Sequence, residues 1–489
     1  MSLRLSRRKR ASLLLALLLG PLLLGPLLLL DGAAAAESVP SADGAKAVRL
    51  PLRSGDGGAP NVLLLTIDTL RMDHLGAYGY RLATSPAIDG LAREGVVFTN
   101  AITPVPMTAP ALASLLTGQH VQVHRVHANV GTFPENVGSI AQAFASAGYE
   151  TAAFYGNEAV EEFGRGFRVF EEFPRKRVPG GLEMADDLGV QRGIEWLSGA
   201  KEPWFLWLHL IDPHGPYDSS PAERSAAFTY PDDPALLKEL ETSPKNWVFG
   251  AIPKYQGLPG GQRVVDYLRR YDGEIVGTDL QIAKLRAWLE AKGEIDHTLI
   301  VLTADHGESL TENNYYFQHG KVLNEASLRV PLLLRHGSLP AGIRVDEPVS
   351  LIDLYPTIAR LAGLPAPAGV EGRDVSETIA GAELGDRLRI TYTVTPDLKV
   401  GVLRGPWRLH GRPQKKKGGV RIDRFPRLHL ADTSRYPEVP ASVEENRDTV
   451  DALARELVDA SRRLRSVEAP KIELTEQQEK RLRALGYVD

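Results

Sequence analysis

The stretch NVLLLTID, residues 61–68, is a continuous apolar run that ends in an acid. Runs of this kind are typical of a strand that is buried on both faces, as in a parallel sheet. PWFLWLHLID at 203–212 and TLIVLTAD at 298–305 have the same form. Helix-like segments such as 85–95 and 277–292 lie between these runs. The alternation predicts an α/β fold in which helices sandwich a mainly parallel central sheet.

Polar side chains follow several of these predicted strands at their carboxyl ends. Asp68 follows the first, the segment from His209 to His214 follows the second, and Asp305 and His306 follow the third. Ligands of open α/β sheets bind at this edge. The sequence therefore predicts that residues far apart in the chain converge there.

The composition excludes several classes of protein. The chain has 489 residues, 43% hydrophobic and 24% charged, as in an ordinary globular protein. This length allows two or three domains, or one large α/β unit with a small appendage. A net charge of −4 gives no indication of a nucleic-acid partner. The absence of cysteine excludes disulfides, thiolate metal sites and cysteine nucleophiles.

The N-terminal segment predicts export. Residues 1–36 comprise a basic stretch, an apolar run over 11–30 and an alanine-rich tail that offers a cleavage site after Ala36. This pattern is typical of a signal peptide and a periplasmic or extracellular protein. An uncleaved membrane anchor is the alternative, because 20 apolar residues can just span a bilayer. Residues 37–59 are small, glycine-rich and polar, which indicates a linker.

Three further segments complete the predicted organisation. Residues 60–380 contain the α/β pattern and form the predicted catalytic domain. Within it, 218–262 has little periodicity, and we interpret it as a substrate-side insertion. Residues 381–489 combine strand-like segments with an amphipathic helix, and they predict a small α+β C-terminal subdomain.

Several of the polar residues suit a metal site. Asp68 alone is equally well explained as a helix cap or turn former. Asp305 beside His306 is more informative, because a buried acid needs a partner and a carboxylate next to an imidazole suits a divalent metal. Each of the remaining candidates alone is more often an ordinary surface or core group. These candidates are His209, Asp212, His214, His319 and Lys321.

Thr108 has two open interpretations. It precedes the helix-like APALASLLTG, with Pro110 in the first turn. Threonine suits an N-cap and proline a first turn, so a structural role alone explains both. A hydroxyl at a helix N-terminus also lies where an anion binds. Beside a metal, it would become an oxygen nucleophile.

Seven motifs together resemble the sulfatase family of the alkaline phosphatase superfamily. The resemblance runs in order from about 61 to 375, with a weaker echo to 489, and it implies an alkaline-phosphatase-like fold. The motifs are NVLLLTIDTLRMDHLGAYGY (61–80), SPAIDGLAREGVVFTNAIT (85–103), ASLLTG (113–118), LHLIDPHGPY (208–217), LTADHGESL (302–310), RVPLLLR (329–335) and LIDLYPTIARLAGLP (351–365).

The chain departs from the sulfatase pattern at the nucleophile. Sulfatases carry cysteine or serine where Thr108 stands, and they oxidise it to formylglycine. Threonine cannot give that aldehyde, and Leu112 replaces the arginine of the same motif. Thr69 follows Asp68 where sulfatases often have a second acid. Asn157 stands near the place of the family's Lys-x-His segment.

Threonine is the nucleophile in the superfamily's nucleotide phosphodiesterases and phosphoethanolamine transferases. The segment 305–320, DHGESLTENNYYFQHG, resembles the second class. That resemblance implies metal ligation by Asp68, Thr108, Asp305 and His306. It also implies a second-metal or substrate role for His214 and His319, and contact of Lys321 with anionic oxygens. For His209, Asp212 and Asn157 we expect contact with substrate.

We therefore expect an exported, metal-dependent phosphoesterase or phosphotransferase that acts on phosphate mono- or diesters through Thr108. The alternatives are a sulfuric ester hydrolase that works without formylglycine, and a catalytically silent binding protein. One or two divalent ions are expected, with zinc or manganese favoured and calcium as the alternative. The expected substrate is a small-molecule, glycan or lipid ester, with membrane contact only through an uncleaved N-terminal segment.

Overall fold

The computed structural model describes residues 50–464 and Glu476, apart from 55–56, 175–176, 179–180, 183–184, 218–227, 259–261, 366, 394–397, 417–418, 422–424 and 435. The predicted signal peptide and most of the predicted linker lie outside the described residues, as does part of the insertion. No helix in the described ranges is long and apolar enough to cross a membrane.

An eight-stranded sheet organises the main α/β body. Its strands are β1 (Asn61–Ile67), β2 (Val96–Phe98), β4 (Glu150–Tyr155), β5 (Val169–Glu172), β8 (Trp204–Leu210), β9 (Thr298–Ala304), β10 (Leu332–Arg335) and β11 (Ile343–Val345). Their order is β11-β2-β10-β9-β1-β8-β4-β5. Strand β10 runs antiparallel to both neighbours, and every other pairing is parallel. The prediction of a mainly parallel sheet is confirmed.

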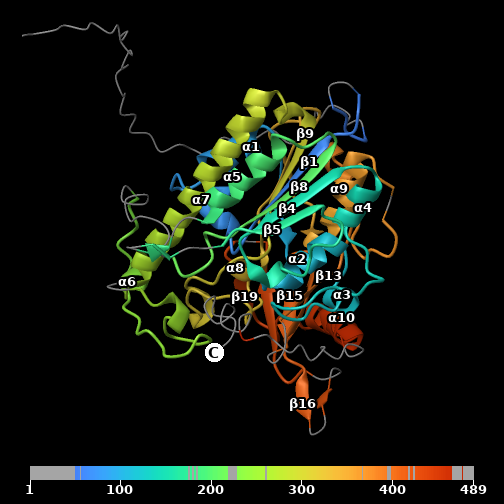
Figure 1. The fold of residues 1–489 in the computed structure, drawn as a ribbon. Helices are drawn as coiled ribbons and strands as arrows, with labels where there is room; N and C mark the ends of the chain where they lie inside the picture. The colour runs from blue at the N-terminus through green and yellow to red at the C-terminus, as the bar shows by residue number, and fades with distance from the viewer. Residues whose placement is uncertain are drawn as a thin grey trace, which may run out of the picture. The chain divides into compact units, whose positions relative to one another are not determined.

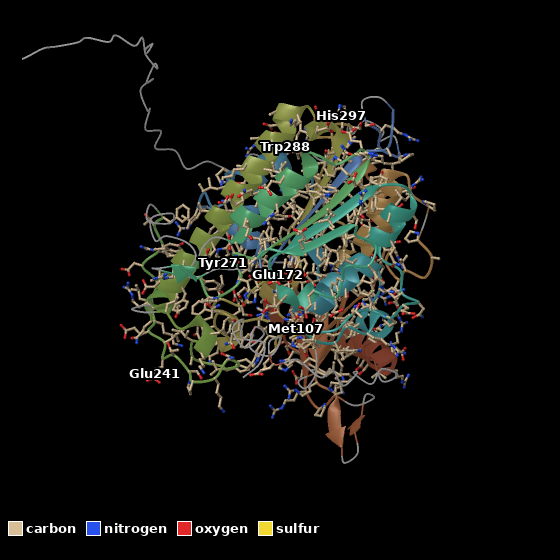
Figure 2. All side chains as sticks on the ribbon, in the orientation of Figure 1. Met107, Glu172, Glu241, Tyr271, Trp288 and His297 are labelled. Carbon is tan, nitrogen blue, oxygen red and sulfur yellow. The ribbon has the colours of Figure 1, made fainter. Side chains whose placement is uncertain are left out.

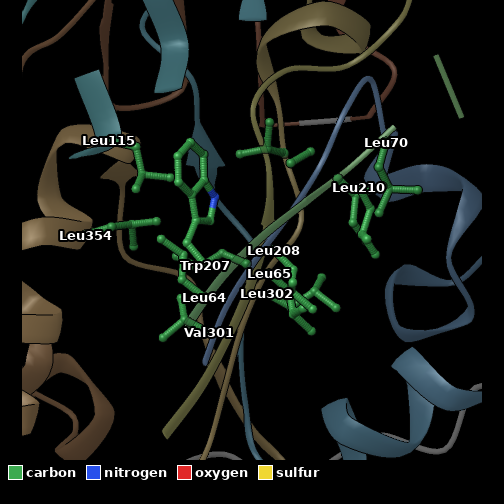
Figure 3. Packing of buried hydrophobic residues seen from close by; sticks show 14 of the residues in the cluster. Leu64, Leu65, Leu70, Leu115, Trp207, Leu208, Leu210, Val301, Leu302 and Leu354 are labelled. Carbon is green, nitrogen blue, oxygen red and sulfur yellow. The ribbon is translucent and has the colours of Figure 1, made fainter. Parts of the chain in front are cut away.

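The three central strands carry the core because every one of their side chains is buried. Leu64 of β1 pairs with Trp207 of β8 on one side and with Val301 of β9 on the other. Figure 3 shows these three side chains packed together, with Leu115 and Leu354 approaching from neighbouring helices. A strand with two buried faces must be apolar throughout, which explains the uninterrupted run at 61–67.

Helices cover both faces of the sheet, as expected (Figure 1). Helices α1, α5 and α7 pack together on one face, and α2, α4 and α9 lie on the other. Their bounds, with those of the shorter helices, are α1 (Pro86–Arg93), α2 (Thr108–Thr117), α3 (Val121–His124), α4 (Ile140–Ser146), α5 (Ala185–Leu197), α6 (Pro234–Leu237), α7 (Val264–Lys292), α8 (Glu325–Leu328) and α9 (Leu354–Ala362).

Helix α7 is 29 residues long and contacts several loops along its length. The Tyr271 hydroxyl donates to the carbonyl of Thr69, directly after β1. Two turns further on, the Thr278 hydroxyl donates to Asp186 of α5. The Asp279 carboxylate accepts from the first backbone amides of α1. The helix starts earlier than the predicted segment 277–292, because Tyr267, Tyr271 and their neighbours continue its buried side.

A separate antiparallel sheet follows in the C-terminal part. Its strands, in spatial order, are β13 (Arg389–Tyr392), β14 (Val400–Arg404), β15 (Trp407–Gly411), β18 (Leu428–Asp432) and β19 (Val439–Ala441). Helix α10 (Arg447–Leu464) packs Leu453 and Leu457 on one face of this sheet, against Val402 and Leu409. The prediction of a small α+β unit is confirmed.

Three two-stranded ribbons complete the described strands. They are β3 (Ala101–Ile102) with β12 (Val349–Ser350), β6 (Arg177–Val178) with β7 (Gly181–Leu182), and β16 (Gln414–Lys416) with β17 (Gly419–Arg421). The last is the basic hairpin that projects at the foot of Figure 1.

Candidate active site

Asp68 lies directly after β1 and is fully buried. Its Oδ2 accepts a hydrogen bond from Asn157 Nδ2 at 2.6 Å, while its Oδ1 has no hydrogen-bond partner among the described residues. The next residue, Thr69, has a φ of 56°, which is strained for a β-branched residue. The amide of Thr69 donates to Asp305 Oδ1 at 3.2 Å, so this turn joins the ends of β1 and β9.

Asp305 and His306 follow β9 and are also fully buried. The Nδ1 of His306 lies 2.9 Å from the carbonyl oxygen of Gly307. Because a carbonyl only accepts, this contact places the proton on Nδ1 and leaves Nε2 as a lone-pair donor. The Nε2 atom lies 3.4 Å from Asp305 Oδ2 and 3.9 Å from Asp68 Oδ1.

Thr108 is the first residue of α2, and its side chain is fully buried. The N-cap residue is Met107, labelled in Figure 2, and its side chain makes no capping hydrogen bond. The interpretation of Thr108 as an N-cap is therefore wrong, because the helix begins one residue earlier than that role requires. The Thr108 hydroxyl oxygen instead lies 3.4 Å from His306 Nε2.

Burial shifts the titration of these groups toward their neutral forms. It raises the pKa of Asp68 well above its usual value, and the nearby charge of Asp305 raises it further. It also raises the pKa of Asp305 to about 7. Burial, with a smaller effect from His319, lowers the pKa of His306 to about 4. Two acids that repel each other in a buried site are stabilised by a cation, and a neutral imidazole is the form that ligates a metal.

The cluster of Asp68, Asp305 and His306 fits a divalent metal. One ligand atom from each residue lies within 4.8 Å of the other two. The unpartnered Oδ1 of Asp68 and the lone pair on His306 Nε2 both belong to this group. Two carboxylate oxygens and an imidazole nitrogen are typical ligands of zinc and related ions. Thr108 stands next to the cluster, where the sequence predicted a fourth ligand.

His209, which we expected to contact substrate, lies beside the same cluster. Its Nε2 is 3.8 Å from Asp68 Oδ2 and has no hydrogen-bond partner among the described residues. Its Nδ1 lies 3.0 Å from the Thr66 hydroxyl, which accepts from the indole nitrogen of Trp207 at 2.9 Å. This chain fixes the ring, and burial lowers the pKa of His209 to about 3.

His214 and His319 form a second group next to His306. The ring centres of His319 and His306 are 4.4 Å apart, and those of His319 and His214 are 5.2 Å apart. The Nδ1 of His319 lies 3.1 Å from Glu308, whose other oxygen accepts from the Tyr217 hydroxyl. Burial raises the pKa of Glu308 to about 8. We did not predict Glu308, although it directly follows the Asp-His-Gly motif.

The remaining candidates occupy distinct places. Asn157 contacts Asp68, as described, and also accepts from the amide of Ala159, and its contact with substrate stays a prediction. The Asp212 carboxylate accepts from the backbone amides of Ala185 and Asp186, which is the role of a helix N-terminal partner. The Lys321 ammonium lies 4.9 Å from the centre of the Trp247 ring.

Asn129 is a further residue at this site that the sequence did not reveal. Its Oδ1 accepts from the amide of Ala109 at 2.9 Å, in the first turn of α2 next to Thr108. Its Nδ2 is buried and has no hydrogen-bond partner among the described residues. No motif or periodicity surrounds Asn129, so only the tertiary structure identifies it.

The described part of the insertion packs on the loop that carries His319. The Tyr255 hydroxyl donates to the carbonyl of Phe317, and Val248 donates to the side chain of Gln318. These contacts place the described part of the insertion next to the loop of the second histidine group, and its substrate-side role stays a prediction.

Comparisons with known proteins identify the family of the chain. Residues 60–364 match the family model "Sulfatase". The chain is 27% identical to an ulvan-active sulfatase from Formosa agariphila over 371 residues, which is 69% of this chain and 68% of that protein. It is 24% identical to a choline-sulfatase from Rhizobium meliloti, over 72% of this chain and 78% of that protein.

Solved structures show the same fold. A phosphonate monoester hydrolase from Agrobacterium radiobacter superposes with a TM-score of 0.67 at 20% identity, covering 86% of this chain and 99% of the other. A protein solved with its substrate D-glucosamine-2-N,6-O-disulfate also gives 0.67, at 16% identity, covering 85% and 100%. The motifs noted in the sequence and the match over more than half of the chain lead to one conclusion. The chain is a hydrolase that belongs to the sulfatase family and has its alkaline-phosphatase-like fold.

Proposed function

We propose that this protein is a metal-dependent hydrolase of phosphate esters that uses Thr108 as its nucleophile. One observation carries the proposal: the Thr108 hydroxyl lies 3.4 Å from His306 Nε2, beside the Asp68 and Asp305 carboxylates, at the start of a helix. A helix N-terminus favours the anionic oxygens of an ester, and a cation held by the three ligands beside the hydroxyl would favour its ionised form.

In the proposed reaction, Asp68, Asp305 and His306 hold a divalent ion, with zinc or manganese favoured by the donor set. When bound, the ion supplies positive charge that lowers the pKa of the Thr108 hydroxyl and offsets charge on the ester oxygens. Asn157 holds the Asp68 carboxylate in orientation through its 2.6 Å hydrogen bond. The Asn129 amide lies next to the attacking residue and can donate to an ester oxygen.

Bond making and breaking then involve Thr108 and His214. The ionised Thr108 oxygen forms a bond to phosphorus, and the bond to the leaving oxygen breaks with its electron pair. His214, whose Nδ1–H donates to the carbonyl of Gly215, takes up the hydroxyl proton of Thr108 at Nε2 and passes it to that leaving oxygen. Water next attacks the phosphothreonine, gives a proton to His214 and releases Thr108. The balanced result is one alcohol and one phosphate for each ester and water. Lys321 and His319 contact the anionic oxygens.

A second candidate is hydrolysis of sulfate esters, and a specific observation favours it. The two relatives compared by sequence are named sulfatases, and one structural neighbour was solved with a disulfated glucosamine. A threonine sulfate ester would be harder to discharge, because threonine lacks the hydrate through which a formylglycine ester collapses. We propose a small-molecule or glycan ester as substrate in either case, and export as the location.

The test compares rates on p-nitrophenyl phosphate, bis-p-nitrophenyl phosphate and p-nitrophenyl sulfate with metal-loaded protein. Thr108→Ala, Thr108→Ser and the matched control Thr117→Ala, on the same helix, run beside the wild type. We expect phosphate turnover that falls at least about 10³-fold in Thr108→Ala, is partly kept in Thr108→Ser and is unchanged in Thr117→Ala. Dominant sulfate turnover would favour the second candidate. Full activity in Thr108→Ala would overturn the nucleophile assignment.

A further inference from the structure

A cavity lies outside the cluster around Thr108, between the C-terminal sheet and the loop after β9. Its volume is about 760 Å³. Strands β15 and β18 form one wall, and Val322, Leu323 and Asn324 form part of another. None of the predicted metal ligands lines it. Its size is in the range of sites that hold a small organic molecule, and it is much larger than one tetrahedral anion requires.

The wall formed by the sheet is basic. Side chains alternate along β15, so Leu409 faces α10 while Arg408 and His410 face the cavity. Among the residues that line the cavity, Glu438 is the single acid, and it is paired with Arg408, which also pairs with Glu325 behind the lining, so the excess positive charge comes from the other basic residues. The basic lining residues are Lys399, Arg408, His410, Arg412, Arg427 and His429. A site with this balance of charge attracts an anion.

Buried polar atoms in the same wall lack hydrogen-bond partners. They are His410 Nδ1, Arg408 Nε and Gln414 Oε1, judged against the described residues. Buried polar groups in native proteins are normally satisfied, so such a group points to a ligand or water. The His410 ring stacks on His429 with ring centres 5.1 Å apart. Burial, and then the charges of Arg408, His429 and Lys399, lower the pKa of His410, which reflects positive surroundings.

The cavity adjoins the segment that carries His319 and Lys321. The ammonium group of Lys399, which lines the cavity, donates a hydrogen bond to the backbone carbonyl of Lys321. Val322 and Leu323 directly follow Lys321 and add apolar surface, as does Phe249 from the insertion. The same short segment therefore carries His319 and Lys321 and forms part of the cavity wall. Apolar carbons beside basic groups suit the two faces of a sugar ring that carries an acidic substituent.

We propose that this cavity binds a second anionic group, a sulfate or carboxylate, on an oligosaccharide ester that is cleaved at Thr108. The inference rests on the proposed function, because it makes the cavity a subsite for the same substrate. The C-terminal sheet then selects multiply charged esters, whereas a small mono-ester such as a p-nitrophenyl compound occupies only the site around Thr108.

The binding test uses the full chain with Thr108→Ala, so that no ligand is consumed. Isothermal titration compares maltohexaose, sulfated maltohexaose and sodium sulfate. We expect the sulfated hexaose to bind, and its affinity to fall about tenfold in Arg427→Ala and in His410→Gln, the loss of roughly one charge-assisted contact. Arg462→Ala is the matched control, because Arg462 is exposed on α10, which packs on the opposite face of the same sheet.

Two results would overturn the inference. One is equal affinity of the cavity variants and the control for the sulfated hexaose. The other is that sodium sulfate binds as tightly as the sulfated hexaose and loses affinity in Arg427→Ala to the same extent. The cavity would then be a site for a free anion. Arg427 is exposed, so its replacement leaves the core intact. It keeps the test valid if His410→Gln does not fold.

A kinetic arm separates this inference from the proposed function. Arg427→Ala with native Thr108 should hydrolyse p-nitrophenyl esters at the wild-type rate, since those esters do not reach the cavity. An equal loss of that rate would overturn the assignment of the cavity as a separate subsite. If the sulfated hexaose binds through Arg427 and His410 but no ester is hydrolysed, the proposed function alone is overturned. If esters are hydrolysed but binding of the hexaose does not depend on these two residues, this inference alone is overturned.

Discussion

The hydroxyl oxygen of Thr108 lies 3.4 Å from Nε2 of His306, although 198 residues separate the two in the chain. Both side chains are fully buried. The contact joins the start of α2, a helix on one face of the central sheet, to the loop after the central strand β9. Any change that moves α2 against the sheet edge will change this distance.

Removal of the metal should destabilise the wild-type protein. In Asp68→Asn, the stability should depend much less on the metal. In the absence of a cation, Asp68 and Asp305 are buried acids that repel each other. We expect zinc or manganese at about 100 times its dissociation constant to stabilise the wild type by about 2.7 kcal/mol. Thermal melting with and without a chelator measures this difference. If the melting temperature of the wild type is the same with and without the metal, the assignment of the ligands is contradicted.

Thr66→Val should loosen His209 without touching the cluster directly. The substitution removes the hydroxyl that lies between the Trp207 indole nitrogen and His209 Nδ1. We expect a loss of about 1–3 kcal/mol in the free energy of unfolding, because a buried donor loses its partner. Urea unfolding measures this loss. Thr66→Ser keeps the hydroxyl and is the control, so equal effects of the two substitutions would assign the loss to packing.

The Arg71–Asp73 ion pair should make stability fall in acid. Burial alone would raise the pKa of Asp73, but Arg71 more than offsets this effect, and the pKa is about 2. A depressed carboxyl pKa stabilises the fold above the ordinary value near 4, and that contribution is lost as the pH falls from about 4 to about 2. In urea unfolding, the gap between wild type and Asp73→Asn should be largest at neutral pH and should shrink across this window. A constant gap would show that the pair does not contribute through titration.

Lys321→Met should raise KM more than it lowers kcat. The Lys321 ammonium lies over the Trp247 ring, between the insertion and the loop that carries His319. If it contacts anionic oxygens in the ground state and the transition state alike, its loss weakens binding uniformly. Methionine preserves most of the stem that packs on Trp247. Steady-state kinetics on p-nitrophenyl phosphate separate the two constants, and an unchanged KM would leave Lys321 as a structural contact.

The carboxyl ends of the central strands were predictable from the sequence. A strand that is buried on both faces is an uninterrupted run of apolar residues, and the first polar residue after the run lies at the carboxyl edge of the sheet. This explains why Asp68 and Asp305 were found in the sequence. Two features that depend on three-dimensional approach were not found. Asn129 has no surrounding pattern, and the helix cap assigned to Thr108 was displaced by one residue to Met107.

The cavity was also invisible in the sequence, for a different reason. Its lining comes from β15, β18 and the loop before α8, and the basic residues among it lie singly on β15, on β18 and in the segments next to the strands of that sheet. A lone arginine or histidine on a strand is normally a solvated surface residue, and only the pairing of His410 with His429 across the sheet gathers them. Family resemblance supplied the Thr108 hypothesis, which composition and periodicity alone left open.

Helix α7 sets the spacing between loops that the chain does not otherwise connect. A residue inserted between Tyr271 and Asp279 would turn everything beyond it by about 100° and advance it by about 1.5 Å. The carboxylate of Asp279 would then face away from the start of α1, while Tyr271 still bound Thr69. Length changes between natural relatives should therefore accumulate in the insertion before α7 and be rare within these two turns. The number of residues between Tyr271 and Asp279 therefore fixes the distance between the loop after β1 and the start of α1. The loops around α7 can change in length and sequence only if that number stays the same.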